Sequence, residues 1–186
     1  NPEKRKADIF GMERLPQYDT KRCAVYREQN GDLFISVHGT SATDGKDLAQ
    51  DAAISLGKTS VKDKGVEKLV RQLLAEGHNI DIGGHSLATQ FITNLPPDLL
   101  EQIDECYLFN PASSPVQRNS YLKNVLALDN VEWFINPSDL VSSGLYNKMG
   151  AKYIKDHVYL GDYKWSALSA HSIDQWNRLS EDDLDE

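Results

Sequence analysis

Residues 78–92 constrain the fold more than any other stretch, because two apolar runs meet there at a glycine pair and a serine. Residues 79–82 alternate polar and apolar side chains, as a β-strand does. Gly83 and Gly84 follow, and we expect the chain to turn sharply where these side chains are missing. Three apolar residues then recur at helical spacing: Leu87, Phe91 and Ile92. The stretch therefore predicts a strand, a tight turn and a helix.

Ser86 stands on the expected turn. A serine between a strand and a helix can form a nucleophile elbow, which raises the hydroxyl above the sheet. The first amides of the helix have no partner within it, so they can hold a developing oxyanion. The pentapeptide 84–88 departs from the usual G-x-S-x-G pattern at Ala88, where alanine is the smallest replacement for glycine. Taken alone, the pentapeptide is equally compatible with a serine that caps a buried helix.

The size and charge of the chain exclude several classes of protein. Its 186 residues suit a single domain, with an arm at 1–20 and an acidic tail at 180–186. The formal charge of −8 argues against binding of nucleic acid or anionic lipid through electrostatic attraction. No apolar run approaches the length of a membrane span, and there is no signal-peptide pattern. The chain begins at Asn1, so we treat it as a possible piece of a longer protein and leave its localisation and oligomeric state open.

Strands and helices are expected to alternate along most of the chain. A hairpin turn is expected at Asn30-Gly31. The expected strands are 23–27, 33–37, 79–82, 106–109 and 131–135, and the main expected helices are 44–56 and 65–76. This alternation predicts an α/β three-layer sandwich, a mainly parallel sheet with helices on both faces. Cys23 and Cys106 begin apolar runs and are expected to be free thiols in the core.

In a sheet of this kind, reactive groups collect just beyond the carboxyl ends of the strands. Four polar residues occupy such places: Thr40, Ser86, Asn110 and Asp139. A serine nucleophile needs a base within hydrogen-bond reach and an acid that orients the base. In elbow enzymes the chain order is serine, acid, histidine, which favours Asp139 and then His171. Asp129, Asp162 and His157 are the alternatives, and Asp129 precedes its strand.

The chain resembles class 3 lipases, the fungal triacylglycerol lipase type of α/β-hydrolase. Five segments carry the resemblance in order, from about residue 33 to 173: 34–40, 83–87, 108–112, 136–141 and 170–172. Within them stand His-Gly-Thr, Gly-Gly-His-Ser-Leu, Phe-Asn-Pro, Asn-Pro-Ser-Asp and Ala-His-Ser. The resemblance implies Ser86 as nucleophile, Asp139 as acid and His171 as base, with an oxyanion hole at the amides of Thr40 and Leu87. It implies hydrolysis of carboxylic esters or lipids through an acyl-enzyme, without a cofactor.

The chain departs from the family at several positions. His38 replaces the usual arginine, Ala88-Thr89 replaces Gly-Gly, and the chain is shorter than typical members. These departures bear on triglyceride specificity more than on hydrolysis. The alternative is a hydrolase-fold binding or structural module of a larger assembly, with a relict triad. A third reading is hydrolysis of a thioester or a peptide on the same triad.

Two further expectations concern access and metals. The stretch 41–64 stands where the resembled family has a lid, but its helix at 44–56 has a thin apolar stripe and no aromatic residue. We therefore expect a site open to solvent, or covered only by a loop at 153–165. The five histidines show no i, i+4 pair and the two cysteines are far apart, so no metal site is expected.

Overall fold

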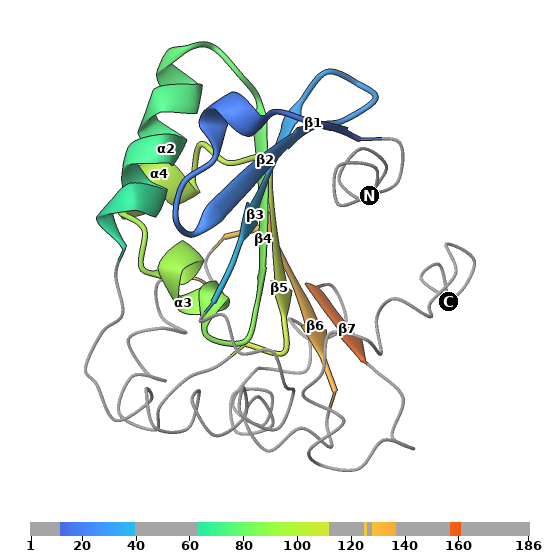
Figure 1. Ribbon diagram of the computed structural model, residues 1–186. Coiled ribbons are helices and arrows are strands. Elements are labelled where there is room, and N and C mark those ends of the chain that lie inside the picture. Colours follow the sequence, from blue (N-terminus) through green and yellow to red (C-terminus); the bar gives the residue numbers. More distant parts are fainter. Residues whose placement is uncertain (1–11, 40–62, 112–124, 126–127, 137–156, 161–186) are drawn as a thin grey trace, which may run out of the picture.

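Seven strands form one sheet in the computed structural model, which describes residues 12–39, 63–111, 125, 128–136 and 157–160. Their order across the sheet is also their order along the chain. The sheet runs through the middle of the molecule, with helices beside it (Figure 1). The strands are β1 Glu13–Arg14, β2 Cys23–Arg27, β3 Leu33–Val37, β4 Ile80–His85, β5 Glu105–Phe109, β6 Val131–Ile135 and β7 Val158–Leu160.

The first three strands are antiparallel. The hairpin turn expected between β2 and β3 is present, and Gly31 adopts a φ of 90°, which favours glycine. Asn30 Oδ1 accepts a hydrogen bond of 2.9 Å from the amide of Asp32, a local bond typical of asparagine in turns. The strands expected at 23–27 and 33–37 are confirmed with the same bounds.

From β3 onward every neighbouring pair of strands is parallel. The carboxyl ends of these strands therefore lie at one edge of the sheet. In register, Val37 of β3 lies beside Gly84 of β4, and His85 lies beside Phe109 of β5. This mainly parallel sheet with connecting helices confirms the expected α/β class.

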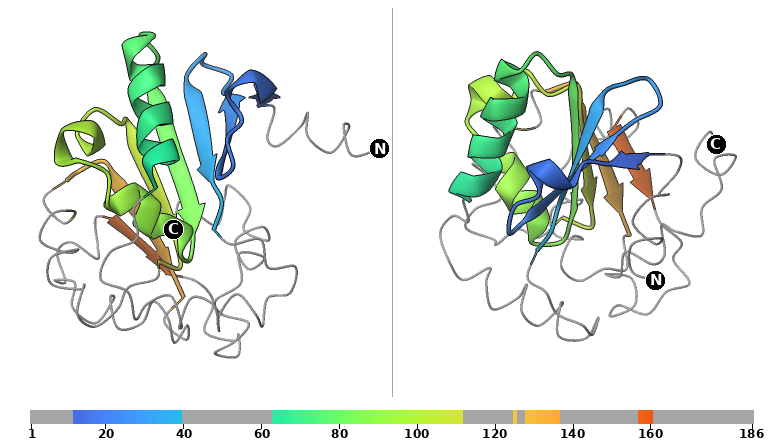
Figure 2. Two further views of the ribbon diagram at one scale, coloured as in Figure 1. Left: turned by 60° about the vertical axis from the view of Figure 1, so that its left-hand side comes forward. Right: turned by 45° about the horizontal axis from the view of Figure 1, so that its top comes forward.

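Three helices lie on the same face of the sheet: α2 Lys64–Ala75, α3 Ala88–Thr93 and α4 Pro97–Leu100 (Figures 1 and 2). The strand order explains this arrangement. When parallel strands follow one another in chain order, right-handed connections all pass over the same face. Helices were expected on both faces; those that the structure describes cover one face, and a second helical layer stays a prediction.

Helix α2 shows how the sequence sets the ends of an element. Asp63 caps its start, because Oδ1 accepts hydrogen bonds from the amides of Gly65 at 2.8 Å and Val66 at 3.2 Å. Gly77 follows its end with a φ of 86°. The helix was expected at 65–76, one residue later at each end.

The core lies between the helices and the sheet. Its largest fully buried side chains include Trp133, Leu33, Ile35, Ile82, Leu108 and Ile135 from the strands, with Leu73 and Ile92 from the helices. Cys23 and Cys106 are free and buried in this core, as expected. Burial raises the pKa of Cys23 to about 11 and also raises the pKa of Cys106, so both thiols are protonated at neutral pH.

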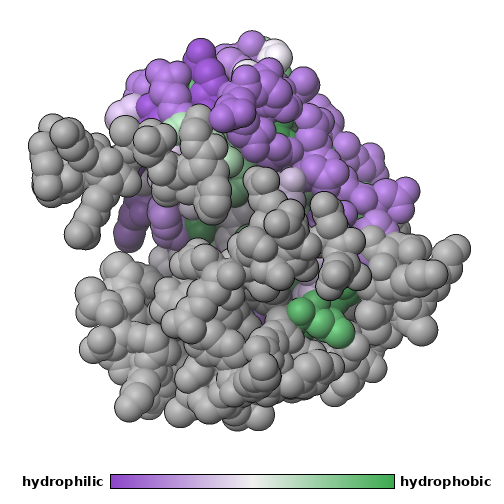
Figure 3. All heavy atoms as spheres, turned by 90° about the vertical axis from the view of Figure 1, so that its right-hand side faces the viewer, coloured by the Kyte–Doolittle hydropathy of each residue, from purple (hydrophilic) through white to green (hydrophobic). Residues whose placement is uncertain are grey.

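The second face of the sheet carries aromatic rings and carboxylates. A row of rings crosses it, with centroids 6.3, 6.4 and 4.9 Å apart in the order Phe34, Tyr107, Phe134 and Tyr159. Asp81, Glu105 and Glu132 belong to the same face by register. Seen from this side, the described residues at the upper end of the molecule are predominantly hydrophilic (Figure 3).

Candidate active site

Strand β4 runs further than the sequence suggested. It continues through Gly83 and Gly84 to His85, so the turn begins at Ser86 and not at the glycine pair. Ser86 has a φ of 57°, in the left-handed region that non-glycine residues seldom adopt. Two residues, Ser86 and Leu87, connect β4 to α3. The expectation that the glycines form the turn was therefore wrong, while the strand, turn and helix are confirmed.

The glycine pair serves close packing on the two faces of β4. A Cβ on Gly83 would lie 2.9 Å from Cζ of the Phe34 ring, on the aromatic face. A Cβ on Gly84 would lie 3.1 Å from Cβ of Ala88 and 3.2 Å from Cδ1 of Ile92, on the helical face. Helix α3 can therefore lie against β4 because Gly84 has no side chain. Alanine at position 88 fits for the same reason, although the usual pattern has glycine there.

The backbone of Ser86 is fixed on both sides. Its amide donates to the carbonyl oxygen of Phe109 at 2.9 Å. Its carbonyl oxygen accepts from the amide of Thr89 at 3.2 Å and from Thr89 Oγ1 at 2.6 Å. The N-cap position of α3 is held by Leu87, which makes no side-chain cap bond. These bonds hold the strained turn in place.

Ser86 is buried, with 2% of its surface exposed. A site open to solvent, or covered only by the loop at 153–165, was expected, and the burial of Ser86 leaves the covered form of that expectation as a prediction. The backbone bonds of Ser86 hold it between the end of β5 and the first turn of α3. Most of 41–64 and most of 153–165, the two stretches considered as covers, lie outside the described residues.

The two segments expected to form an oxyanion hole approach each other. A Cβ on Gly39, just after β3, would lie 3.7 Å from the amide nitrogen of Ala88 at the start of α3. Leu87 is nearly buried, with 7% of its surface exposed. Thr40, the second expected donor, lies outside the described residues, but its peptide group begins at the Gly39 carbonyl. The structure thus brings Ala88, the residue after the expected donor Leu87, beside Gly39, the residue that precedes Thr40.

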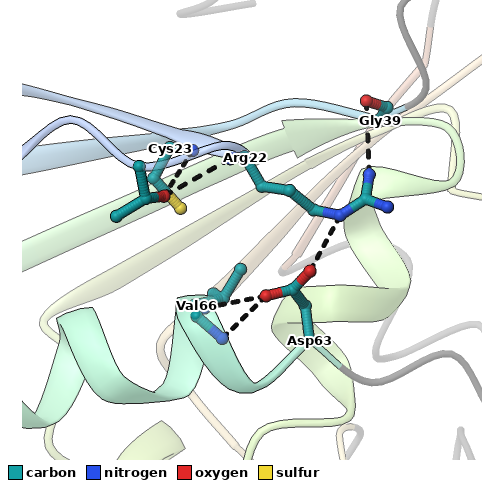
Figure 4. Close-up of polar contacts among 7 residues, drawn as sticks. Arg22, Cys23, Gly39, Asp63 and Val66 are labelled. Carbon is teal, nitrogen blue, oxygen red and sulfur yellow. Dashed lines mark hydrogen bonds and ion pairs between the residues drawn. The ribbon is translucent and has the colours of Figure 1, made fainter.

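Arg22 joins this region from the start of β2, as Figure 4 shows. Arg22 Nε donates to Asp63 Oδ2 at 2.8 Å, and Arg22 Nη1 lies 3.5 Å from the carbonyl oxygen of Gly39. The guanidinium also lies over the ring of Phe91, 4.4 Å from its centroid. Sequence reasoning missed Arg22, because its partners are distant in the chain. One signal was available, since the hairpin at Asn30-Gly31 places Arg22 opposite His38, the position where the resembled family has arginine.

A hydrogen bond between two asparagines joins the ends of β5 and β6. Asn110 follows β5 with a φ of 40° and is fully buried. Its Oδ1 accepts a hydrogen bond of 3.0 Å from the amide of Asn136, the residue after β6. Its own amide donates to the carbonyl oxygen of Phe134 at 2.7 Å. This pair fixes where the chain leaves β6, immediately before the segment that carries Asp139.

Asp139 and His171, the expected acid and base, lie outside the described residues, as does Asp162. The structure nevertheless bears on two alternatives. Asp129 is exposed in the turn that precedes β6, at the opposite edge of the sheet from Ser86. His157 directly precedes β7, three strands away from β4. Neighbouring strands are about 4.8 Å apart, so His157 is beyond hydrogen-bond reach of Ser86.

The most perturbed carboxyl group lies away from Ser86. Burial and a hydrogen bond with Glu28 raise the pKa of Asp81 to about 7, with further contributions from Asp104 and Asp32. Asp81 is near the start of β4, at the amino edge of the parallel strands. Perturbed carboxyls often mark functional sites, but among the described residues no group of three or more potential ligands could hold a metal. We interpret Asp81 as a buried structural acid.

One pocket lined by described residues is separate from the elbow. It has a volume of about 600 Å³ and lies between the start of α2 and the chain around α3 and α4. Phe91, Leu95 and Leu100 line it, together with Asp63 and Glu67, and Ser86 does not. This pocket is therefore no direct extension of the candidate active site.

Comparisons with known proteins give no independent assignment. No protein-family model matches the chain, and no curated protein is significantly similar to it. Among the helices that the structure describes, none is long and apolar enough to cross a membrane. The candidate site therefore depends on its own geometry and on the sequence motifs.

Proposed function

We propose that this chain is a serine hydrolase that cleaves carboxylic esters through an acyl-enzyme, on a fold of the α/β-hydrolase kind. One observation carries the proposal. Ser86 adopts a φ of 57° on a two-residue turn between a parallel strand and a buried helix. Strain of this kind persists only where the surrounding structure fixes it, and it is concentrated at functional sites. The turn places a serine at the carboxyl edge of the sheet, where a nucleophile elbow carries its serine.

In the proposed reaction, His171 removes the proton from Ser86, and Asp139 holds the imidazole in the required tautomer. The serine oxygen attacks the ester carbonyl carbon, and the negative charge of the tetrahedral intermediate is stabilised by the amides of Thr40 and Leu87. His171 then protonates the leaving alcohol. Water, activated by the same histidine, hydrolyses the acyl-enzyme and releases the acid. This mechanism needs no metal or cofactor.

The burial of Ser86 favours a second candidate. Only 2% of the surface of Ser86 is exposed, and a serine that never meets a substrate can be buried in this way. A hydrolase-like module that serves binding or assembly, with a relict triad, would have no need for such access. The two candidates differ in one measurable property, the reactivity of Ser86.

A fluorophosphonate probe tests that reactivity directly, with intact mass and peptide mapping to locate the adduct. We expect one adduct, on Ser86, and turnover of short-chain aryl esters. Ser86→Ala should abolish both, with a loss in kcat on the order of 10⁴-fold or more. Ser36→Ala, the same change on the neighbouring strand β3, is the matched control and should keep full activity. An Ser86→Ala variant with unchanged turnover would rule out the assignment, and an unlabelled wild type would favour the relict module.

A further inference from the structure

We propose that Thr89 is a positioning residue for the oxyanion hole, an inference that rests on the proposed esterase activity. Thr89 Oγ1 donates a hydrogen bond of 2.6 Å to the carbonyl oxygen of Ser86. That oxygen belongs to the same peptide group as the amide of Leu87, the expected oxyanion donor. No contact between Thr89 and a substrate is involved. Its role is to set the direction of a peptide group that does contact the reacting atoms.

The direction of the Leu87 amide follows from peptide geometry. A trans peptide group is planar, and its N–H points opposite to its carbonyl oxygen. The Ser86 oxygen faces Thr89, because it accepts from the Thr89 amide at 3.2 Å as well as from the hydroxyl. The N–H of Leu87 must therefore point away from Thr89. Ser86, Leu87 and Thr89 thus form one arrangement in which the threonine holds the oxygen end of the peptide group and leaves the N–H end directed outward.

The hydroxyl bond is the shorter of the two that hold this peptide group. Its length of 2.6 Å is at the short end for an O–H···O bond, whereas 3.2 Å is at the long end for the N–H···O bond of the amide. A hydrogen bond to a carbonyl oxygen also polarises the peptide group and strengthens its N–H as a donor. The Thr89 hydroxyl therefore both orients the Leu87 amide and makes it a stronger donor.

Thr89 can set this direction because its own position is fixed. It is fully buried, with 0% of its surface exposed, and its branched Cβ leaves the side chain few rotamers. Its carbonyl oxygen accepts a hydrogen bond of 3.0 Å from Thr93 Oγ1, one turn further along α3. Thr89 is also one of the two residues that replace Gly-Gly of the resembled family, and glycine has no side chain that could make this bond. The hydroxyl bond therefore belongs to the departure of this chain from the family pattern.

The expected kinetic effect falls on kcat. An oxyanion donor acts on charge that develops in the transition state, so its displacement lowers kcat with little change in KM. Complete removal of one donor costs about 100- to 1000-fold in kcat. Thr89→Val keeps the Leu87 amide and the longer of the two bonds to the Ser86 oxygen, so we expect a smaller loss of about 10-fold.

The experiment compares three substitutions at Thr89 with the wild type and one control. Thr89→Val and Thr89→Ala both remove the hydroxyl, and both should lower kcat and leave KM within about 2-fold. Thr89→Ser keeps the hydroxyl but loses a buried methyl group, so it should be less stable than the wild type and keep its kcat. Thr93→Val is the matched control, because it removes the same kind of bond, from a buried threonine hydroxyl to a carbonyl oxygen of the preceding turn. The control should keep the wild-type kcat.

A second measurement is independent of turnover. In NMR spectra, the carbonyl ¹³C resonance of Ser86 and the amide resonance of Leu87 should shift in Thr89→Val and stay close to their wild-type positions in Thr89→Ser and Thr93→Val. Unchanged resonances in folded Thr89→Val, or a kcat equal to that of Thr93→Val, overturn the positioning role, as does a Thr89→Ser variant that loses as much kcat as Thr89→Val. A wild type that neither turns over esters nor is labelled at Ser86 instead refutes the proposed function, and the two resonances still decide whether Thr89 orients this peptide group.

Discussion

Replacing Ser86 by glycine and by alanine should separate the strain of the elbow from the chemistry of the hydroxyl. Both variants remove the nucleophile, so both should be inactive. They differ in the backbone, because alanine keeps a Cβ at a φ of 57° and glycine does not. The difference between the two free energies of unfolding therefore measures the strain at this turn.

The expected size can be worked from the backbone. A residue with a Cβ in the left-handed region costs about 1–2 kcal/mol. Ser86→Gly avoids this cost. Part of its advantage is lost again, because folding costs glycine about 0.5–1 kcal/mol more in conformational entropy than it costs alanine. We therefore expect Ser86→Gly to be more stable than Ser86→Ala by about 1 kcal/mol. In a chain of this size, 1 kcal/mol corresponds to a Tm difference of about 2–4 °C.

Urea titration and calorimetry of the two variants provide the measurement. The same pair of substitutions at Ser36, in the middle of strand β3, is the control. At Ser36 the glycine variant should be the less stable of the two, because glycine in the middle of a strand lowers the free energy of unfolding by about 0.5–1 kcal/mol relative to alanine. If Ser86→Ala is as stable as Ser86→Gly, Ser86 is not in the left-handed region, and the elbow that supports the proposed function is refuted.

Two further predictions concern the base and the buried acid. His171→Ala should lower kcat as much as Ser86→Ala, and the double variant should be scarcely worse, because triad members act as a unit. His157→Ala should be active, because His157 is three strands away from β4, and an inactive His157→Ala beside an active His171→Ala would refute the choice of His171. For Asp81, the folded pKa of about 7 lies above the ordinary value of 3.8, so its contribution to stability is complete below pH 3.8 and is lost as the pH rises through 7. Asp81→Asn cannot ionise and should raise the free energy of unfolding at pH 8 by roughly one to four kcal/mol, since each pKa unit is worth about 1.4 kcal/mol. Urea titrations at pH 4 and pH 8 check this, and an equal change at both values would contradict it.

Local patterns predicted β2 to β6 and α2, because each depends on nearby residues, whereas the short edge strands β1 and β7 were not among the expected strands. The β2 and β3 bounds follow from alternation on both sides of Asn30-Gly31, and β6 matches the expected 131–135. The serine turn was found because the glycine pair, Ser86 and the apolar residues behind it are contiguous. Its position was two to three residues too early, since Gly83 and Gly84 are needed for packing against Phe34 and Ala88 and not for turning.

The rest of the site depends on contacts between residues distant in the chain. Arg22 meets Asp63, Gly39 and Phe91 only after β2, α2 and α3 have packed, and no local pattern specifies that meeting. The burial of Ser86 is likewise a tertiary property. The expected roles of Asp139, His171 and Thr40 stay predictions.

The strand order affects how the sheet grows as the chain is synthesised. Each new parallel strand adds to the one before it, so the sheet always presents a single advancing edge. In the described part of the sheet, that growth ends at β7 with three residues, and the opposite edge ends at β1 with two. Short edge strands offer few unpaired amides and carbonyls to another chain, which limits edge-to-edge aggregation. A chain that stops before residue 131 would instead leave the five residues of β5 as an open edge, so nascent or truncated forms should be the aggregation-prone ones.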